Sequence, residues 1–134
     1  MALDTWAVLA WLKRQQPAAS KVRSLLESAE MRELGLCMSI VNVGDVYYLS
    51  AKERDPAYAD RVLDLLRSRV TWIPAHDDLV IQAASIKAQH PISYADAFAA
   101  ATSIVKQVPL VSGDADFRRL ESVEAGFQLE WIGE

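Results

Sequence analysis

The stretch Pro109-Leu110-Val111-Ser112-Gly113-Asp114-Ala115-Asp116-Phe117 places two acidic residues directly after a short apolar run. We expect a strand over residues 108–111, a turn at Gly113 and a short helix over residues 116–120. This stretch therefore predicts a strand that ends beside an acid and is followed by a helix. The same succession can be sought in the rest of the chain.

The chain opens with the same succession, because a brief strand is predicted to end near Asp4 and an apolar helix to follow over residues 5–15. Between these two units, short apolar runs alternate with longer amphipathic ones. Further strands are expected at 36–39, 70–73 and 127–132, and further helices after Pro17, through Asp45 to Leu49, from Asp55-Pro56, over 77–89 and from Ser93 to about 106. This alternation predicts an α/β fold: one domain over residues 1–134, with a central parallel sheet flanked by helices on both faces.

Five aspartates lie in or beside apolar stretches, namely Asp4, Asp45, Asp96, Asp114 and Asp116. Carboxylates are rarely buried unless they are paired or bind metal. Asp4 and Asp114 follow predicted strands, and we expect Asp45 and Asp96 in the first turns of helices that begin at the same edge of the sheet. Ligands bind at that edge in parallel sheets, and oxygen ligands suit Mg²⁺ or Mn²⁺. The sequence therefore predicts a metal site that acts on a phosphodiester.

Each acid also has a purely structural interpretation. Ser93 and Asp96 have the spacing of a capping box. Either Asp114 or Asp116 could cap the short helix that follows, and Asp4 could stand beside Thr5 at a helix start. Asp45 differs, since it lies inside an apolar helical stretch where Asp is a poor helix former. Separate caps that all fall at one sheet edge are a less economical explanation than one shared site.

The net charge of −4 disfavours a nucleic-acid partner when it is taken alone, because phosphate binding usually needs a basic face. Two bound divalent cations would offset about four of these charges. The chain contains neither GxxxxGK[ST] nor GxGxxG, which argues against a nucleotide-binding loop. His76 and His90 have no metal-ligand spacing and are expected at the surface.

The compartment is indicated by the single cysteine, Cys37, which lies in an apolar run and can form no intramolecular disulfide. It suggests a buried thiol in a reducing cytoplasm. No apolar run approaches the roughly 20 residues that span a bilayer. We therefore expect a cytoplasmic protein without a membrane segment.

Taken in order, four motifs resemble the PIN-domain ribonucleases, especially the small VapC-type toxins of toxin–antitoxin pairs. They are Leu3-Asp4-Thr5-Trp6, Val41-Asn42-Val43-Gly44-Asp45-Val46-Tyr47-Tyr48, Ser93-Tyr94-Ala95-Asp96-Ala97 and Ser112-Gly113-Asp114-Ala115-Asp116-Phe117. The resemblance covers essentially the whole chain. Two positions depart from it: the second acid is usually Glu and is here Asp45, and Trp6 stands where a small hydroxyl residue is common.

The resemblance implies a Mg²⁺-dependent endoribonuclease, with Mn²⁺ as a possible substitute, that cleaves an RNA substrate. The implied catalytic residues are Asp4, Asp45, Asp96 and Asp114, the implied metal ligands are Asp4, Asp96, Asp114 and Asp116, and Thr5 and Ser112 are supporting residues. It also implies a cognate antitoxin protein that occupies an apolar groove, and a homodimer. Trp11, Tyr47 and Tyr48 are candidate contact residues.

Two other functions stay open at this point. Asp45 and Trp6 are compatible with a catalytically weak or inactive PIN scaffold that binds protein or RNA. A phosphatase of the haloacid-dehalogenase type also begins with a strand-end aspartate, but it needs a second Asp at the position that Trp6 occupies.

Overall fold

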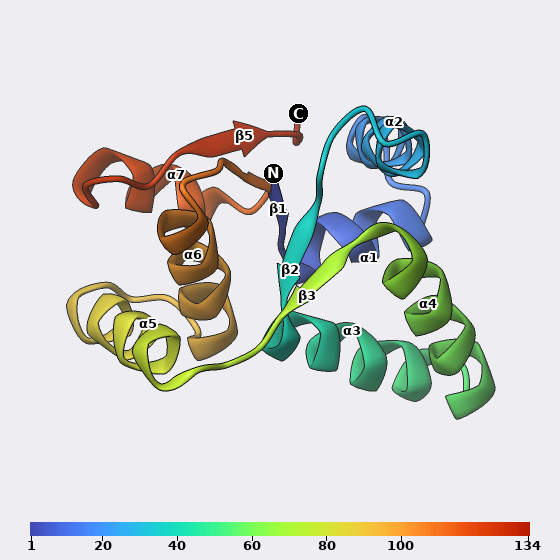
Figure 1. Cartoon of the computed structure of the whole chain (residues 1–134), viewed down its shortest axis with the longest axis horizontal. Helices are drawn as coiled ribbons and strands as arrows, with labels where there is room; N and C mark the ends of the chain where they lie inside the picture. The colour runs from blue at the N-terminus through green and yellow to red at the C-terminus, as the bar shows by residue number, and fades with distance from the viewer.

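Five short strands form one fully parallel sheet in the computed structural model, which describes residues 1–134 (Figure 1). The strands are β1 (Ala2–Leu3), β2 (Cys37–Ser39), β3 (Thr71–Ile73), β4 (Leu110–Ser112) and β5 (Leu129–Trp131), in the spatial order β3-β2-β1-β4-β5. The helices are α1 (Thr5–Leu12), α2 (Ala18–Glu30), α3 (Ile40–Glu53), α4 (Pro56–Arg69), α5 (Asp77–Gln89), α6 (Tyr94–Lys106) and α7 (Ala115–Val123). The predicted α/β fold with a parallel sheet is confirmed.

Helices cover both faces of this sheet, as predicted. In Figure 1, α1, α2 and α4 lie to the right of the central strands, whereas α5 and α6 lie to the left. The alternation of side chains along the strands separates two cores: Leu3 and Val111 pack on the side of α1 to α4, and Ala2 and Leu110 on the side of α5 to α7. Each core consists of buried hydrophobic side chains, so both faces of the sheet contribute hydrophobic stabilisation.

The strand order places a change of direction beside β1. The chain adds β2 and then β3 on one side of β1, and afterwards returns to add β4 and β5 on the other. Neighbouring connections therefore diverge at the carboxyl ends of β1 and β4, which is where open parallel sheets bind ligands. Asp4 follows β1, and Asp114 lies two residues after the end of β4.

Three expectations need correction. The helix expected to reach residue 15 ends at Leu12, and Arg14 adopts a left-handed conformation with φ 57°. Asp45 lies in the second turn of α3 instead of the first, because Ser39 ends β2 and caps the helix without an intervening loop. His90 is not a free surface residue, since its side chain is only 15% exposed and its Nε2 lies 2.9 Å from the Glu124 carboxylate.

Cys37 is the only cysteine and is a free, half-buried thiol in β2. Burial raises its pKa, which favours the unreactive thiol over the thiolate. None of the helices combines the length and the hydropathy that crossing a bilayer requires.

Candidate metal centre

Asp4 is the innermost acid of the site and is 1% exposed. One carboxylate oxygen accepts a hydrogen bond from the backbone N–H of Ala7 (2.7 Å), and the other accepts one from the Ser112 hydroxyl (2.6 Å). Burial, aided by the charges of Asp96 and Asp114, raises the pKa of Asp4 to about 7 even though the hydrogen bonds from Ser112 and Ala7 lower it. Asp4 is thus both the N-cap of α1 and a carboxyl group placed under the other acids.

The turn after β4 is built from short-range hydrogen bonds to polar side chains. Ser112 is fully buried, and its hydroxyl oxygen accepts the backbone N–H of Asp114 at 3.0 Å. Asp114 caps α7 by accepting the N–H of Asp116 at 2.9 Å. Asp116 is also ion-paired with Arg119 on the next turn of the helix. Ser112 therefore links Asp4 to the start of α7 and fixes the turn that carries two further acids.

Asp96 reaches the site from the first turn of α6. Ser93 caps this helix by accepting the backbone N–H of Asp96 at 3.1 Å, as the predicted capping spacing requires. Burial and the nearby charge of Asp114 raise the pKa of Asp96 to about 6. The predicted cap at Ser93 is confirmed, and the same turn carries the Asp96 carboxylate to the edge where the other acids lie.

Carboxylate oxygens of Asp96, Asp114 and Asp116 all lie within 4.8 Å of one another. Oxygens that share one Mg²⁺ at about 2.1 Å are at most about 4.2 Å apart, so small side-chain adjustments suffice to bring these three around one ion. The donor set contains only oxygen, which suits a hard divalent cation better than zinc or copper. The residues present therefore fit such an ion.

Asp4 and Asp45 lie outside this three-acid group. Asp45 accepts the Thr5 hydroxyl at 3.3 Å, and Thr5 in turn accepts the amide N–H of Asn42 at 3.2 Å. The Asn42 amide also donates to the carbonyl of Ala95 (3.1 Å), one residue before Asp96. Burial raises the pKa of Asp45, and the bond from Thr5 opposes this. The fold brings all five predicted acids and both supporting residues to one edge of the sheet. The acids form two tiers there: the three-acid group, and a second tier of Asp4 and Asp45.

Asn42 and Arg119 are residues that the motifs did not single out. Asn42 is fully buried and ties α3 to both α1 and α6, while its amide oxygen has no hydrogen-bond partner. In the sequence, the only sign of this role is that Asn42 is a polar residue at an apolar helical position. The sign can be interpreted only when the positions of α1 and α6 are known. Arg119 belongs to a pair of arginines, and only the helical phase distinguishes it from Arg118.

Trp6 covers the turn at Gly113. A side-chain carbon added to Gly113 would lie 2.2–2.8 Å from atoms of the Trp6 ring. The glycine is therefore required for space, and the bulky residue at position 6 is accommodated by packing on the turn that carries Asp114. The departure from the small hydroxyl residue expected here leaves the acids in place.

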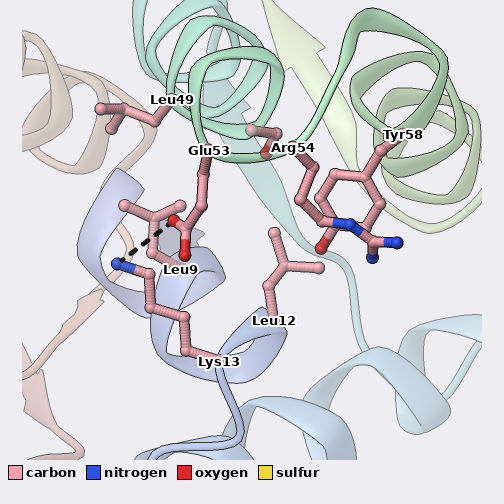
Figure 2. Close-up of a pocket in the computed structure, with 8 residues that line it drawn as sticks. Leu9, Leu12, Lys13, Leu49, Glu53, Arg54 and Tyr58 are labelled. Carbon is pink, nitrogen blue, oxygen red and sulfur yellow. Dashed lines mark ion pairs between the residues drawn. The ribbon is translucent and has the colours of Figure 1, made fainter.

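A separate groove of about 400 Å³ lies between α1, α3 and α4 (Figure 2). Leu9 and Leu12 of α1 and Leu49 of α3 supply apolar lining, and Lys13 and Glu53 form an ion pair at 3.9 Å. Leu9 and Leu49 each come four residues after a site residue, Thr5 and Asp45. Since residues four apart share a helix face, the groove lies on the same faces of α1 and α3 as Thr5 and Asp45, further along each helix.

Residues 1–123 match the family model of the PIN domain, and the chain belongs to this family. No curated protein sequence matches the chain. The family match ends before β5, but β5 pairs with β4 throughout its length and so belongs to the same sheet.

Several solved structures share this fold over nearly their whole length. VapBC2 of Rickettsia felis, bound to a DNA fragment from its promoter, is 17% identical with a TM-score of 0.72, and the alignment covers 96% of each chain. Mycobacterium tuberculosis VapC20, described as a sarcin–ricin loop cleaving toxin, is 17% identical with a TM-score of 0.71, covering 89% of this chain and 93% of that one. FitAcB of Neisseria gonorrhoeae is 20% identical with a TM-score of 0.61, covering 90% and 92%.

Proposed function

We propose that this protein is a Mg²⁺-dependent cytoplasmic endoribonuclease, with Mn²⁺ as a substitute, and the toxin of a toxin–antitoxin pair. The observation that carries the proposal is the convergence of Asp96, Asp114 and Asp116 within 4.8 Å, at the switch point of a PIN-domain sheet. The description of the similar VapC20 structure as a sarcin–ricin loop cleaving toxin supports a toxin that acts by cleavage.

The acids have different roles in this proposal. Asp96, Asp114 and Asp116 hold the divalent cation, and Asp4 adds negative charge behind them from a fixed, buried position. When bound, such a cation lowers the pKa of a water molecule and stabilises charge on the phosphate. Without a cation Asp4 keeps its proton up to about pH 7, so cation binding releases protons. Thr5 orients Asp45 at the rim, where its carboxylate can accept a proton or hold water.

The test compares two isosteric substitutions that each remove one carboxylate. Asp96→Asn should abolish metal-dependent cleavage of a total-RNA pool while the circular dichroism spectrum stays unchanged. Asp55→Asn is the matched control, because Asp55 caps α4 on the exposed surface, and Asn also caps helices well. EDTA should abolish cleavage by the unsubstituted protein. Retained cleavage by Asp96→Asn would refute the assignment of the site.

We further propose that the antitoxin lies in the groove between α1, α3 and α4 (Figure 2). A segment seated there would end at the acidic edge, because the groove follows the helix faces that carry Thr5 and Asp45. Once the antitoxin has been identified, it should protect RNA from cleavage. Leu49→Arg should remove this protection while RNA cleavage itself persists.

A homodimer is also proposed, and Tyr48, which is 54% exposed on α3, is its best candidate contact among the aromatic residues. Size-exclusion light scattering should give twice the monomer mass. A stable monomer at high concentration would contradict the dimer.

A catalytically weak scaffold is the second candidate function. It is favoured by the position of Asp45, whose shorter side chain is bonded to Thr5 and lies outside the three-acid group. Calorimetry distinguishes the two functions, since absence of both Mn²⁺ binding and RNA cleavage would favour the scaffold.

A further inference from the structure

A second cavity, of about 300 Å³, adjoins the three-acid group and shares Asp116 with it. Its walls are the loop at residues 90–92, between α5 and α6, and one side of α7. Ile92 and Leu120, 7% and 2% exposed, supply buried apolar lining. Ligand pockets usually measure about 300–1,000 Å³, so this cavity lies at the small end of that range and has room for one small ring system.

The two walls of this cavity are tied together. The ring of His90 contacts the Glu124 carboxylate at 2.9 Å, and these side chains are only 15% and 22% exposed. This contact joins the loop before α6 to the end of α7. The contact fixes the two walls of the cavity relative to each other.

Arg119 places a positive charge between the cavity and the acids. One guanidinium nitrogen, Nη2, contacts Asp116, yet the side chain is 69% exposed. A guanidinium carries five N–H donors in a planar fork that matches the oxygens of a phosphate. Arg119 can therefore bind an anion beside the acidic site while it keeps its contact with Asp116.

We infer that this cavity is an RNA subsite that receives one nucleobase, with the adjoining phosphate bound by Arg119. Single-stranded RNA is recognised through splayed bases placed against flat or apolar side chains and through cationic contacts to its backbone. A nucleotide held here would place a neighbouring phosphodiester over Asp96, Asp114 and Asp116. This inference rests on the proposed nuclease function and adds the position of the substrate.

Arg118 provides a matched control for Arg119, because it has the same charge and is the preceding residue on α7. Its guanidinium lies 3.6 Å over the Trp131 ring and does not line the cavity. Binding is measured by fluorescence anisotropy of a labelled single-stranded RNA of mixed sequence, in Mg²⁺, with Asp96→Asn present to prevent cleavage. Arg119→Ala should weaken binding about tenfold, as expected for loss of a hydrogen bond to a charged group.

The salt dependence gives a readout that a merely structural role would not change. Loss of one phosphate contact to single-stranded RNA should lower the slope of log affinity against log salt by about 0.7. Arg118→Ala should leave both the affinity and the slope close to those of the parent. Ser122→Phe, which fills the cavity without altering charge, should weaken binding and leave the slope unchanged.

The subsite and the nuclease function fail in different ways. Equal losses for Arg119→Ala and Arg118→Ala, or unchanged binding by Ser122→Phe, would overturn the subsite even if the unsubstituted protein cleaves RNA. The predicted binding differences in a protein that cleaves no RNA would support the subsite and refute the nuclease.

Discussion

Asp4 both stabilises the fold through hydrogen bonds and destabilises it through the burial of its charge. It caps α1 and accepts the Ser112 hydroxyl, yet burial raises its pKa to about 7. Both effects follow from its position at the end of β1, beneath the other acids. Because its carboxylate is costly without a cation, the stability of the protein should depend on pH and on divalent metal.

In EDTA, we expect the free energy of unfolding to fall as the pH rises from about 4 to about 7. An unfolded Asp loses its proton near pH 3.8, whereas Asp4 keeps its proton to about pH 7 and Asp96 to about 6. The unfolded chain binds fewer protons in this window, so a rise in pH favours unfolding. The effect of Asp4 alone is on the order of 4 kcal/mol.

Urea unfolding across this pH range, with EDTA or with Mg²⁺, measures the effect. Mg²⁺ should flatten the pH profile because it favours the ionised acids. Asp4→Asn should also flatten it in EDTA. A substituted protein with the same pH profile as the original would show that Asp4 ionises normally.

Asp45→Asn should reduce RNA cleavage by about 10–100-fold, in the range seen when residues that support metal ligands are lost. Asp96→Asn should instead remove cleavage completely. The difference is expected because Asp45 lies outside the three-acid group and is held by Thr5. Initial rates measured across a Mg²⁺ titration compare the two variants. A complete loss in Asp45→Asn at every Mg²⁺ concentration would contradict this supporting role and make Asp45 indispensable for cleavage.

Among the structural elements, the contact between α1 and the turn after β4 is the least expected. Gly113→Ala should destabilise the protein by about 1–3 kcal/mol, as overpacking does, because the new methyl group would collide with the Trp6 ring. Gly44→Ala, in α3 with open space around it, should instead stabilise by about 1 kcal/mol. Urea unfolding measures both changes.

A double-mutant cycle isolates this contact. Trp6→Ser makes room for the methyl group, so Gly113→Ala should cost less in the Trp6→Ser background than in the original protein. Strictly additive free energies would mean that the turn moves away from Trp6 without cost.

The helices show what the sequence can and cannot predict. The residues of α5 were predicted in full, because His90-Pro91 ends an amphipathic run. The end of α1 was not, since Arg14 takes the left-handed position that is usually marked by glycine. The second-turn position of Asp45 depends on an uninterrupted passage from β2 to α3, and no turn residue signals this.

At the scale of the whole molecule, the order of the strands explains why acids far apart in sequence meet. The positions of Asp4, Asp96 and Asp114 at strand ends and helix starts were predictable from local patterns, whereas Asp45 lies one turn further into its helix than expected. The division of the acids into a three-acid group and a second tier was not predictable, because it depends on the angle between α3 and α6 and on the Asn42 contacts that join them. The cavity beside Asp116 likewise needs the loop before α6 and the end of α7 to meet through His90 and Glu124.

Removal of the last strand, β5, would test whether the sheet needs all five strands. The family match ends at residue 123, but β5 pairs with β4, and Phe127 and Ile132 are 4% and 2% exposed. Loss of a large buried side chain typically costs about 2–5 kcal/mol, and a domain has only about 5–15 kcal/mol in total. A chain of residues 1–123 should therefore be largely unfolded, and the exposed backbone edge of β4 should promote aggregation.

Circular dichroism and thermal unfolding should show this, whereas removal of Gly133 and Glu134 alone should leave the unfolding transition intact. If residues 1–123 unfolded cooperatively at the original temperature, β5 would be an appendage, and the acids would be held by the four remaining strands.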